Sequence, residues 1–217
     1  WILTQMMATE EEFYSVMLIG SQGVGKTTFL TNGTSTNEAR AGQVVHFGQT
    51  IVTLEGKTVK LNVYDTPGQN SPHAMLNSMI RYKESAIIIY DITNKDTFDQ
   101  CNLWLQDIYF KAEDNIIVFL VGNIKPGERE VTVQEAQDFA DRNDLHFKEV
   151  DGTKKEDLDG LFKVVVQYVA TLQDTARQDG ITVPKKRRRD TIELSVDRDK
   201  ADKQIEKKKS SSGGCKC

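Results

Sequence analysis

Residues 20–27 read GSQGVGKT, which has the spacing of a phosphate-binding loop. Glycines let such a loop curl so that its N–H groups point inward at phosphate oxygens, and a following helix adds its positive end. Lys26 can then reach the β- and γ-phosphates, and the Thr27 hydroxyl can ligate Mg²⁺. An ordinary strand-to-helix turn is the alternative, but the motif follows an apolar run, Phe13–Ile19, and opens a helical stretch, Lys26–Leu30. We therefore predict a polyphosphate site here.

A second motif, DTPGQ at residues 65–69, fits the first and follows the strand-like run VKLNVY. An aspartate that ends a strand beside a phosphate loop can hold Mg²⁺, a glycine N–H can sense a γ-phosphate, and a glutamine can orient an attacking water. These roles fall on Asp65, Gly68 and Gln69. Alone the pentapeptide would be read as a surface turn. Beside the phosphate loop it predicts a metal site at Thr27 and Asp65, with Gln69 as the catalytic residue.

The elements that position these motifs alternate between apolar runs and helical patterns. Continuous apolar strands between helices predict a mostly parallel sheet that is covered on both faces. The turn Glu55-Gly56-Lys57 predicts one hairpin, and Thr132 with Glu135 predicts a helix N-terminus with a capping box. We expect an α/β fold of the P-loop NTPase class, with six strands, one of them an antiparallel edge strand. The expected strands are 13–19, 50–55, 59–64, 86–90, 116–121 and 146–150, and the expected helices are 26–30, 73–81, 97–110, 133–142 and 156–172.

Charge divides the chain into an acidic part and a basic end. Residues 185–217 carry 12 Lys or Arg and 6 Asp or Glu, whereas the other 184 residues carry 16 and 26. We expect a flexible N-terminus over residues 1–12, a folded domain over 13–175 and a flexible basic tail over 176–217. The acidic domain excludes a nucleic-acid groove, and no apolar run is long enough to span a bilayer. Two of the three cysteines lie at the extreme C-terminus, which predicts a reducing compartment and not a disulfide framework.

Taken together, the motifs resemble those of the Rab family of small GTPases in the Ras superfamily. The resemblance covers about residues 13–172 and rests on GSQGVGKT, LEGKTVKLNVYDTPGQ, IIIYDITNKDTF and VGN. It implies a monomeric G domain that binds GTP or GDP with Mg²⁺, hydrolyses GTP slowly, and presents its switch loops to effector and regulator proteins. The residues expected to bind the nucleotide are Gly20, Ser21, Gln22, Gly23, Val24, Gly25, Lys26, Thr27, Thr28, Asp65, Gly68, Asn123, Lys125, Asp151, Gly152 and Thr153.

The C-terminus GGCKC resembles the Rab pattern in which two cysteines receive geranylgeranyl groups from the prenylation machinery, here Cys215 and Cys217. The C-a-a-X rule does not fit, because Gly214 stands at the cysteine place. Two lipids and the basic run Lys185–Arg189 exceed what stable anchoring needs, so we expect the cytoplasmic face of an intracellular membrane, with a cytosolic pool. A disulfide or a metal site at the two cysteines, and a nuclear import signal or a solvated charge run at residues 184–189, are the alternatives.

Departures from the family pattern lie in the parts that read the nucleotide. Gln22 stands where the family has a small residue, which predicts poor hydrolysis or a poor response to an activating protein. The switch threonine of the family falls on Gly42 or Val45, depending on the direction of counting, so neither position supplies the hydroxyl. Pro67 replaces a small residue and removes one backbone N–H.

The base-reading loop departs furthest. The family reads Asn-Lys-x-Asp, and this chain keeps Asn123 but has Ile124 at the lysine place and Pro126 at the aspartate place. The aspartate pairs with guanine in a way that adenine cannot match, so its loss predicts weaker guanine selectivity. Glu128 is the nearest carboxylate along the chain that could replace it. The family's Ser-Ala-Lys corresponds to residues 151–153, where backbone N–H contacts to the base survive substitution.

Two functions remain after this reading. The first is a membrane-tethered GTP-binding switch in vesicle traffic, with weakened guanine selectivity and slow turnover. The second is a Rab-like scaffold that binds nucleotide weakly or not at all and acts through protein contacts and its lipid tail. A P-loop protein that has changed to another nucleotide is a third, less favoured reading. The intact phosphate loop and Gln69 favour the first.

Overall fold

The computed structural model describes residues 12–38, 46–66, 79–112 and 116–178. The chain divides into two compact units, Trp1–Lys185 and Lys186–Cys217, and all described residues belong to the first. The predicted N-terminal segment apart from Glu12, and the predicted tail apart from residues 176–178, lie outside the described residues. Within the described part, no helix is both long and apolar enough to cross a membrane.

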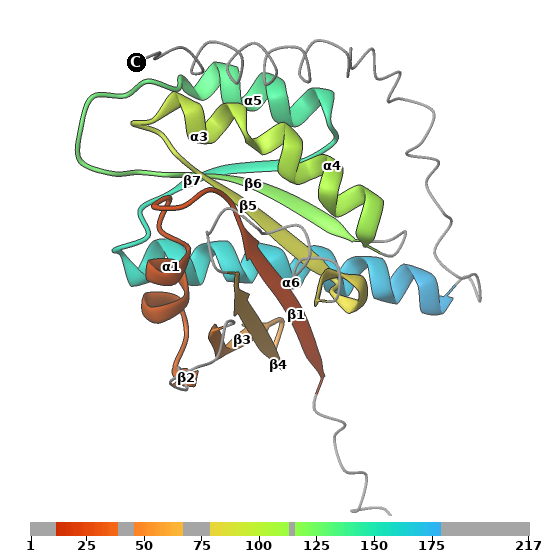
Figure 1. Ribbon diagram of the computed structural model, residues 1–217. Helices are drawn as coiled ribbons and strands as arrows, with labels where there is room; N and C mark the ends of the chain where they lie inside the picture. Colours follow the sequence, from red (N-terminus) through yellow and green to blue (C-terminus); the bar gives the residue numbers. More distant parts are fainter. Residues whose placement is uncertain (1–11, 39–45, 67–78, 113–115, 179–217) are drawn as a thin grey trace, which may run out of the picture. The chain divides into compact units, whose positions relative to one another are not determined.

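The described strands form one sheet in the order β2-β3-β4-β1-β5-β6-β7 (Figure 1). Neighbours from β4 to β7 pair in parallel, and β3 is antiparallel to both β2 and β4. The predicted α/β class with a mostly parallel sheet is confirmed. The strands are β1 Phe13–Ile19, β2 Thr36–Glu38, β3 His46–Leu54, β4 Lys57–Asp65, β5 Ser85–Asp91, β6 Ile117–Asn123 and β7 His146–Val150.

In the described part of the chain the sheet has seven strands, the six that the sequence predicts and one more. The additional strand is β2, whose three residues are too few to show a period of two. Its backbone pairs with β3, and Ser35 N–H donates to the Gln49 carbonyl at 2.9 Å just before it. The antiparallel strand β3 is therefore second from the edge, which corrects its predicted place at the edge.

The predicted hairpin joins β3 and β4. Glu55 and Gly56 at its turn both have positive φ, 48° and 82°, as a two-residue hairpin turn of the favoured hand requires. The ladder runs from Leu54 opposite Lys57 to His46 opposite Asp65, so β3 begins four residues before the predicted strand. This longer ladder places His46 beside the end of β4.

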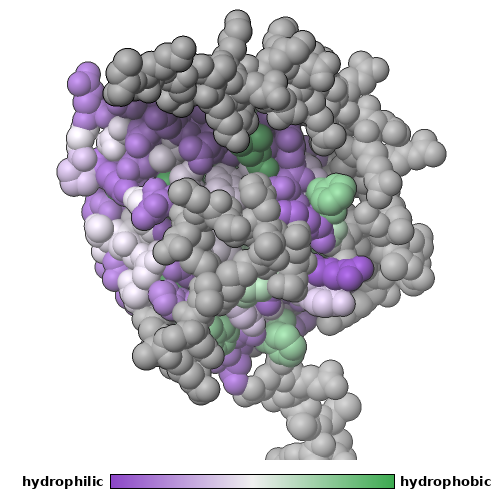
Figure 2. All heavy atoms as spheres, in the orientation of Figure 1, coloured by the Kyte–Doolittle hydropathy of each residue, from purple (hydrophilic) through white to green (hydrophobic). Residues whose placement is uncertain are grey.

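Helices cover both faces of the sheet (Figure 1). Residues of α1 and α6 pack with one side of the sheet, and residues of α3, α4 and α5 pack with the other. Seen from the side of Figure 2, the described surface is mostly hydrophilic with scattered hydrophobic residues, as expected when two layers of apolar residues are buried. The helices are α1 Lys26–Gly33, α3 Lys95–Asp99, α4 Cys101–Lys111, α5 Val133–Arg142 and α6 Lys155–Gln178, with a 3₁₀ turn η1 at Ile80–Tyr82.

Helix boundaries differ from prediction in four places, the first being α1, which continues past the predicted Leu30 to Gly33. The helix predicted over residues 97–110 is two helices, α3 and α4, that meet at Gln100. The helix α6 continues to Gln178, past the predicted helix end at 172 and the predicted domain end at 175. The sequence does not predict this extension because residues 173–178 are mostly polar and carry no apolar period. Most of the helix predicted over residues 73–81 lies outside the described residues, and its end is the 3₁₀ turn η1.

One of the two hydrogen bonds of the predicted capping box forms at the N-terminus of α5. Thr132 is the N-cap, and its hydroxyl accepts from the backbone N–H of Glu135 at 3.2 Å. The Glu135 carboxylate instead accepts from Lys95 Nζ at 2.5 Å, which links α5 to α3. The reciprocal bond of the box is therefore replaced by an ion pair between helices.

Replacing Thr132 with alanine should lower the free energy of unfolding by about 1 kcal/mol, because an N–H in the first turn of α5 loses its acceptor. Urea unfolding of the full chain measures this. Thr171→Ala is the matched control, since its exposed hydroxyl bonds back to the Gln167 carbonyl within α6 and caps no helix end. Equal losses for the two variants would contradict the capping role.

Candidate functional site

The phosphate loop lies between β1 and α1, as predicted, and its glycines are required by its shape. Gly20, Gly23 and Gly25 have φ of 146°, 81° and 104°. A Cβ on Gly20 would lie 2.3 Å from the Ile89 carbonyl oxygen, and one on Gly25 would lie 2.5 Å from Asn123 Nδ2. Gly25 is the N-cap of α1 and has no side chain to bond the first N–H groups of the helix. Those N–H groups are therefore available to an anion at the loop.

Lys26 is 5% exposed and its ammonium lies inside the curl of the loop. Its Nζ donates to the carbonyl oxygens of Gly20 at 2.8 Å and Ser21 at 2.7 Å. Burial lowers the pKa of Lys26, and the negative charge of Asp65 opposes that shift. Since an ammonium has three donors, one N–H has no acceptor among the described residues and can bind a phosphate oxygen.

The predicted metal residues lie together. Thr27 Oγ1 donates to Asp65 Oδ2 at 2.6 Å, and Asp65 is 4% exposed. Its other oxygen, Oδ1, is buried and has no hydrogen-bond partner among the described residues. A buried carboxylate oxygen without a partner is costly unless a ligand completes it. A hydroxyl and a carboxylate are oxygen ligands that Mg²⁺ prefers, so the residues present fit Mg²⁺.

His46 also lies at this place, and the sequence analysis did not assign it to the site. Its Nδ1 is 3.7 Å from Asp65 Oδ2, because the two residues are opposite each other in the β3–β4 ladder. The ladder extends to His46 only because β3 begins earlier than the apolar pattern indicates. A count of register back from the Glu55-Gly56 turn is the signal that could have found the contact.

Several predicted residues lie outside the described part of the chain. These are the two candidates for the switch threonine, the residues that follow Asp65 and Thr66 in the second motif, and the terminal cysteines: Gly42, Val45, Pro67, Gly68, Gln69, Cys215 and Cys217. Their predicted roles stay predictions. Thr66 itself is buried, and its hydroxyl donates to the Leu18 carbonyl at 2.8 Å, which ties the end of β4 to β1.

Asn123 joins three segments of the site. It ends β6 and is 4% exposed. Its Nδ2 donates to the Val24 carbonyl at 2.8 Å, and its Oδ1 accepts from the Gly152 N–H at 3.2 Å. The structure therefore brings the phosphate loop, the end of β6 and the loop after β7 together, as the predicted site requires.

Lys125, and not Ile124, supplies the cation that contacts the phosphate loop. Its Nζ donates to the Gly23 carbonyl at 2.5 Å and to Asp91 Oδ2 at 2.8 Å. Ile124 is 39% exposed, and its N–H donates to the Val150 carbonyl. The residue after the isoleucine thus places a cation against the phosphate loop, because its long side chain reaches the Gly23 carbonyl.

Asp91 is a second residue that the sequence analysis did not assign. It ends β5 opposite Asn123 in the β5–β6 ladder. Burial disfavours its ionised form, but hydrogen bonds from Lys125 and Thr93 outweigh that effect and leave the pKa of the carboxyl below its usual value. Asp91 therefore anchors Lys125 as an anion. Its place at the end of the run IIIYD, next to the strand that carries Asn123, is a signal that could have identified it.

The loop after Asn123 has no carboxylate at the family's aspartate position, because Pro126 stands there. Pro126 and Glu128 are both exposed, and Gly127 between them has φ of 139°. Arg129 then ties the end of the loop to β7, since its two Nη atoms donate to Glu149 at 2.6 and 2.9 Å. The predicted loss of the family's carboxylate at Pro126 thus stands, and the ends of the loop are held by Ile124 and Arg129.

The backbone N–H groups of residues 151–153 all have acceptors within the protein. Asp151 N–H donates to Asp157, Gly152 N–H to Asn123, and Thr153 N–H to the Asp151 carboxylate. Hydrogen bonds from Thr153 lower the pKa of Asp151. The predicted backbone contact with a base at residues 151–153 would therefore require one of these bonds to be shared or released.

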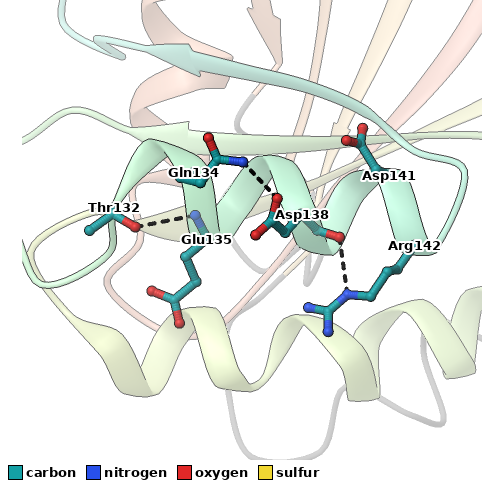
Figure 3. Close-up of a pocket in the computed structure, with 6 residues that line it drawn as sticks. All are labelled: Thr132, Gln134, Glu135, Asp138, Asp141 and Arg142. Carbon is teal, nitrogen blue, oxygen red and sulfur yellow. Dashed lines mark hydrogen bonds between the residues drawn. The ribbon is translucent and has the colours of Figure 1, made fainter.

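A separate pocket runs along α5 (Figure 3) and is lined by Thr132, Gln134, Glu135, Asp138, Asp141 and Arg142. Gln134 Nε2 donates to Asp138 Oδ1 at 2.7 Å, and Arg142 Nε donates to the Asp138 carbonyl at 3.0 Å. None of these residues belongs to the predicted nucleotide site. Gln134, Asp138 and Arg142 bond within α5, and the Glu135 carboxylate bonds to Lys95 of α3, so the pocket shows no converging set of groups for a ligand.

Comparison with known proteins agrees with this geometry. A family model described as the Ras family matches residues 15–171. Ras-related protein Rab-4B from Homo sapiens is 33% identical over 179 residues, which is 80% of this chain and 84% of that protein. Ras-related protein Rab-4A from Homo sapiens is 33% identical over 164 residues, 73% of this chain and 75% of its own. GTP-binding protein ypt3 from Schizosaccharomyces pombe is 32% identical over 171 residues, 75% and 80% of the two chains.

The match covers β1 to α6 and therefore includes the phosphate loop, the Thr27–Asp65 pair and the loop that begins at Asn123. The two Rab proteins and ypt3 each align with 73–80% of this chain at 32–33% identity. The chain belongs to the Rab family of small GTPases, within the Ras superfamily.

Proposed function

We propose that this protein is a GTP-binding switch in intracellular, vesicle-mediated membrane traffic, and that it hydrolyses GTP slowly. The observation that carries the proposal is the phosphate loop with a buried Lys26 inside it and the Thr27–Asp65 pair beside it. Family membership supports it, since the relative ypt3 is itself a GTP-binding protein. Effectors and regulators would bind the switch regions, and the protein would act as a monomer.

Different residues of the site would bind the phosphates, the metal ion and the attacking water. Lys26 and the first N–H groups of α1 bind phosphate oxygens, because they are donors fixed in place before the ligand arrives. Thr27 and Asp65 would hold Mg²⁺, which when bound neutralises charge on the phosphates. Gln69 would orient the water that attacks the γ-phosphate, and the Gly68 N–H would contact that phosphate. Gln22 is exposed in the loop, and its side chain would slow hydrolysis by crowding the γ-phosphate or a partner's arginine.

The base side of the site supports weak selectivity for guanine. Pro126 has no carboxylate, and the N–H groups of residues 151–153 are already bonded within the protein. A ligand's affinity would then come mainly from its phosphates, which GTP and ATP share. The same observation supports the scaffold alternative, because a site without contacts to the base would also fit a protein that has lost nucleotide binding altogether.

Titrating the full chain with labelled GTP, GDP and ATP in Mg²⁺, and then following phosphate release, separates these functions. We expect GTP and GDP to bind and ATP to compete, with a preference of about 100-fold or less, compared with about 10⁴-fold where a site is built to hydrogen-bond its substrate. Pro126→Asp should raise the preference for GTP, and Lys26→Ala should abolish binding of all three. Absence of wild-type binding at micromolar nucleotide would rule out the switch and favour the scaffold.

Replacing Lys125 with alanine should weaken GDP binding by about tenfold to a hundredfold, since a charged hydrogen bond to the Gly23 carbonyl is lost and the anion Asp91 loses its cation. Competition with labelled GDP measures the change. Lys163→Ala on the exposed face of α6 is the matched control and should leave the affinity unchanged. If the two variants bind GDP equally well, Lys125 has no part in the site.

The tail supports a peripheral membrane protein. Cys215 and Cys217 would receive geranylgeranyl groups, and the basic run Lys185–Arg189 would add attraction to anionic lipids. This anchor would hold the domain at the cytoplasmic face of an intracellular membrane, with a soluble pool.

The double variant Cys215→Ser, Cys217→Ser should move the protein from the membrane fraction to the soluble fraction, because both lipid attachment sites are gone. Fractionation of cells that express each form measures the distribution. Ser212→Ala, which keeps both cysteines, should fractionate as wild type. Unchanged membrane association of the double variant would refute the lipid anchor.

A further inference from the structure

A side chain from the other side of the sheet contacts the phosphate loop. Ser21 Oγ donates to Gln100 Oε1 at 2.8 Å, although the two residues are 79 positions apart in the sequence. Ser21 is 8% exposed, whereas Gln100 is exposed and lies where α3 ends and α4 begins. The side chain of Gln100 makes no capping bond to α4, so its described contact is with the loop.

The residues on both sides of Gln100 are held by hydrogen bonds or by burial in the core. Thr97 in α3 accepts from the Asp91 backbone N–H at 3.0 Å, which fixes α3 to the end of β5. Phe98 is buried and its ring is 4.9 Å from that of Tyr90 and 5.5 Å from that of Phe139. Cys101, the next residue after Gln100, is fully buried. The backbone at Gln100 is thus held in place by buried neighbours on both sides, and its exposed side chain reaches Ser21 from there.

Hydrogen bonds hold the phosphate loop at the residues on both sides of Gln22. On one side, the Ser21 side chain bonds to Gln100, and the Ser21 carbonyl accepts from Lys26. On the other side, the Gly23 carbonyl accepts from Lys125. Both contacts are linked to Asp91. Its N–H donates to Thr97 of α3, the helix that ends at Gln100, and its carboxylate accepts from Lys125.

We propose that Gln100 is a positioning residue for nucleotide binding, which holds Ser21 so that the phosphate loop keeps its curl when the site is empty. The proposal rests on the proposed function, since the nucleotide is the ligand whose binding would benefit. Gln100 acts through Ser21 and does not itself contact the phosphates. A loop that is already curled loses less conformational entropy on binding, so the affinity for nucleotide is higher. Affinity differences between variants of one site appear mostly in the dissociation rate, so we expect slower release from wild type.

Dissociation of fluorescent GDP from the full chain, chased with unlabelled GDP, tests the proposal. Gln100→Ala should release GDP about three to ten times faster, the effect of one neutral hydrogen bond. Asn102→Ala, an amide-to-alanine change at an exposed position of the same helix, should release it as wild type does. Ser21→Ala should accelerate release similarly, and the double variant should be no faster than either single one, because both remove the same bond.

Two further measurements separate positioning from general stability and from the proposed function. The urea midpoint of Gln100→Ala should fall below that of Asn102→Ala by no more than the loss of one neutral hydrogen bond explains, so that the fold is intact while the release rates differ. In the nucleotide-free full chain, amide hydrogen exchange at residues 20–25 should be faster in Gln100→Ala than in wild type or Asn102→Ala. If wild type binds no nucleotide, the proposed function fails, and the exchange rates still decide the positioning role. Equal exchange in all three proteins would overturn it.

Discussion

The two hydrogen bonds of Asn123 are the contact on which the rest of the site depends. One holds the Val24 carbonyl of the phosphate loop, and the other holds the Gly152 N–H after β7. Asn123 is buried between two glycines. A Cβ on Gly25 would lie 2.5 Å from its Nδ2, and one on Gly152 would lie 2.5 Å from the Phe29 ring and 3.3 Å from Asn123 Oδ1. Both glycines are needed for three loops from distant parts of the chain to meet at one amide.

Charge in the phosphate half of the site is arranged for a ligand. Lys26 is buried with its ammonium bonded to two carbonyl oxygens, and Asp65 is buried with one oxygen unpartnered among the described residues. Buried charges are stable only when they are paired and hydrogen-bonded. Mg²⁺ and a polyphosphate would complete both groups at once, since the metal pairs with the carboxylate and the phosphate with the ammonium.

Features set by short stretches of sequence were predicted well, and those set by distant contacts were not. The bounds of β1, β7 and α5 agree with prediction, because apolar runs and a threonine cap are local signals. The phosphate loop has its predicted place because its glycines determine its own backbone. In contrast, β2 forms by pairing with β3, and Gln100 meets Ser21 across 79 residues. No pattern within a window of sequence contains either contact.

In the base-reading loop the two departures from the family pattern, Ile124 and Pro126, have different consequences. A lysine side chain is long and flexible, so Lys125 reaches the Gly23 carbonyl although it lies one residue after the family's lysine place. An aspartate has one methylene, and its carboxylate cannot reach the same place from another position. Glu128 is two residues after Pro126 and is separated from it by Gly127, whose positive φ turns the backbone there. The loop therefore contacts the phosphate loop through Lys125 but has no carboxylate at Pro126, which is why we expect nucleotide to be held with little regard to its base.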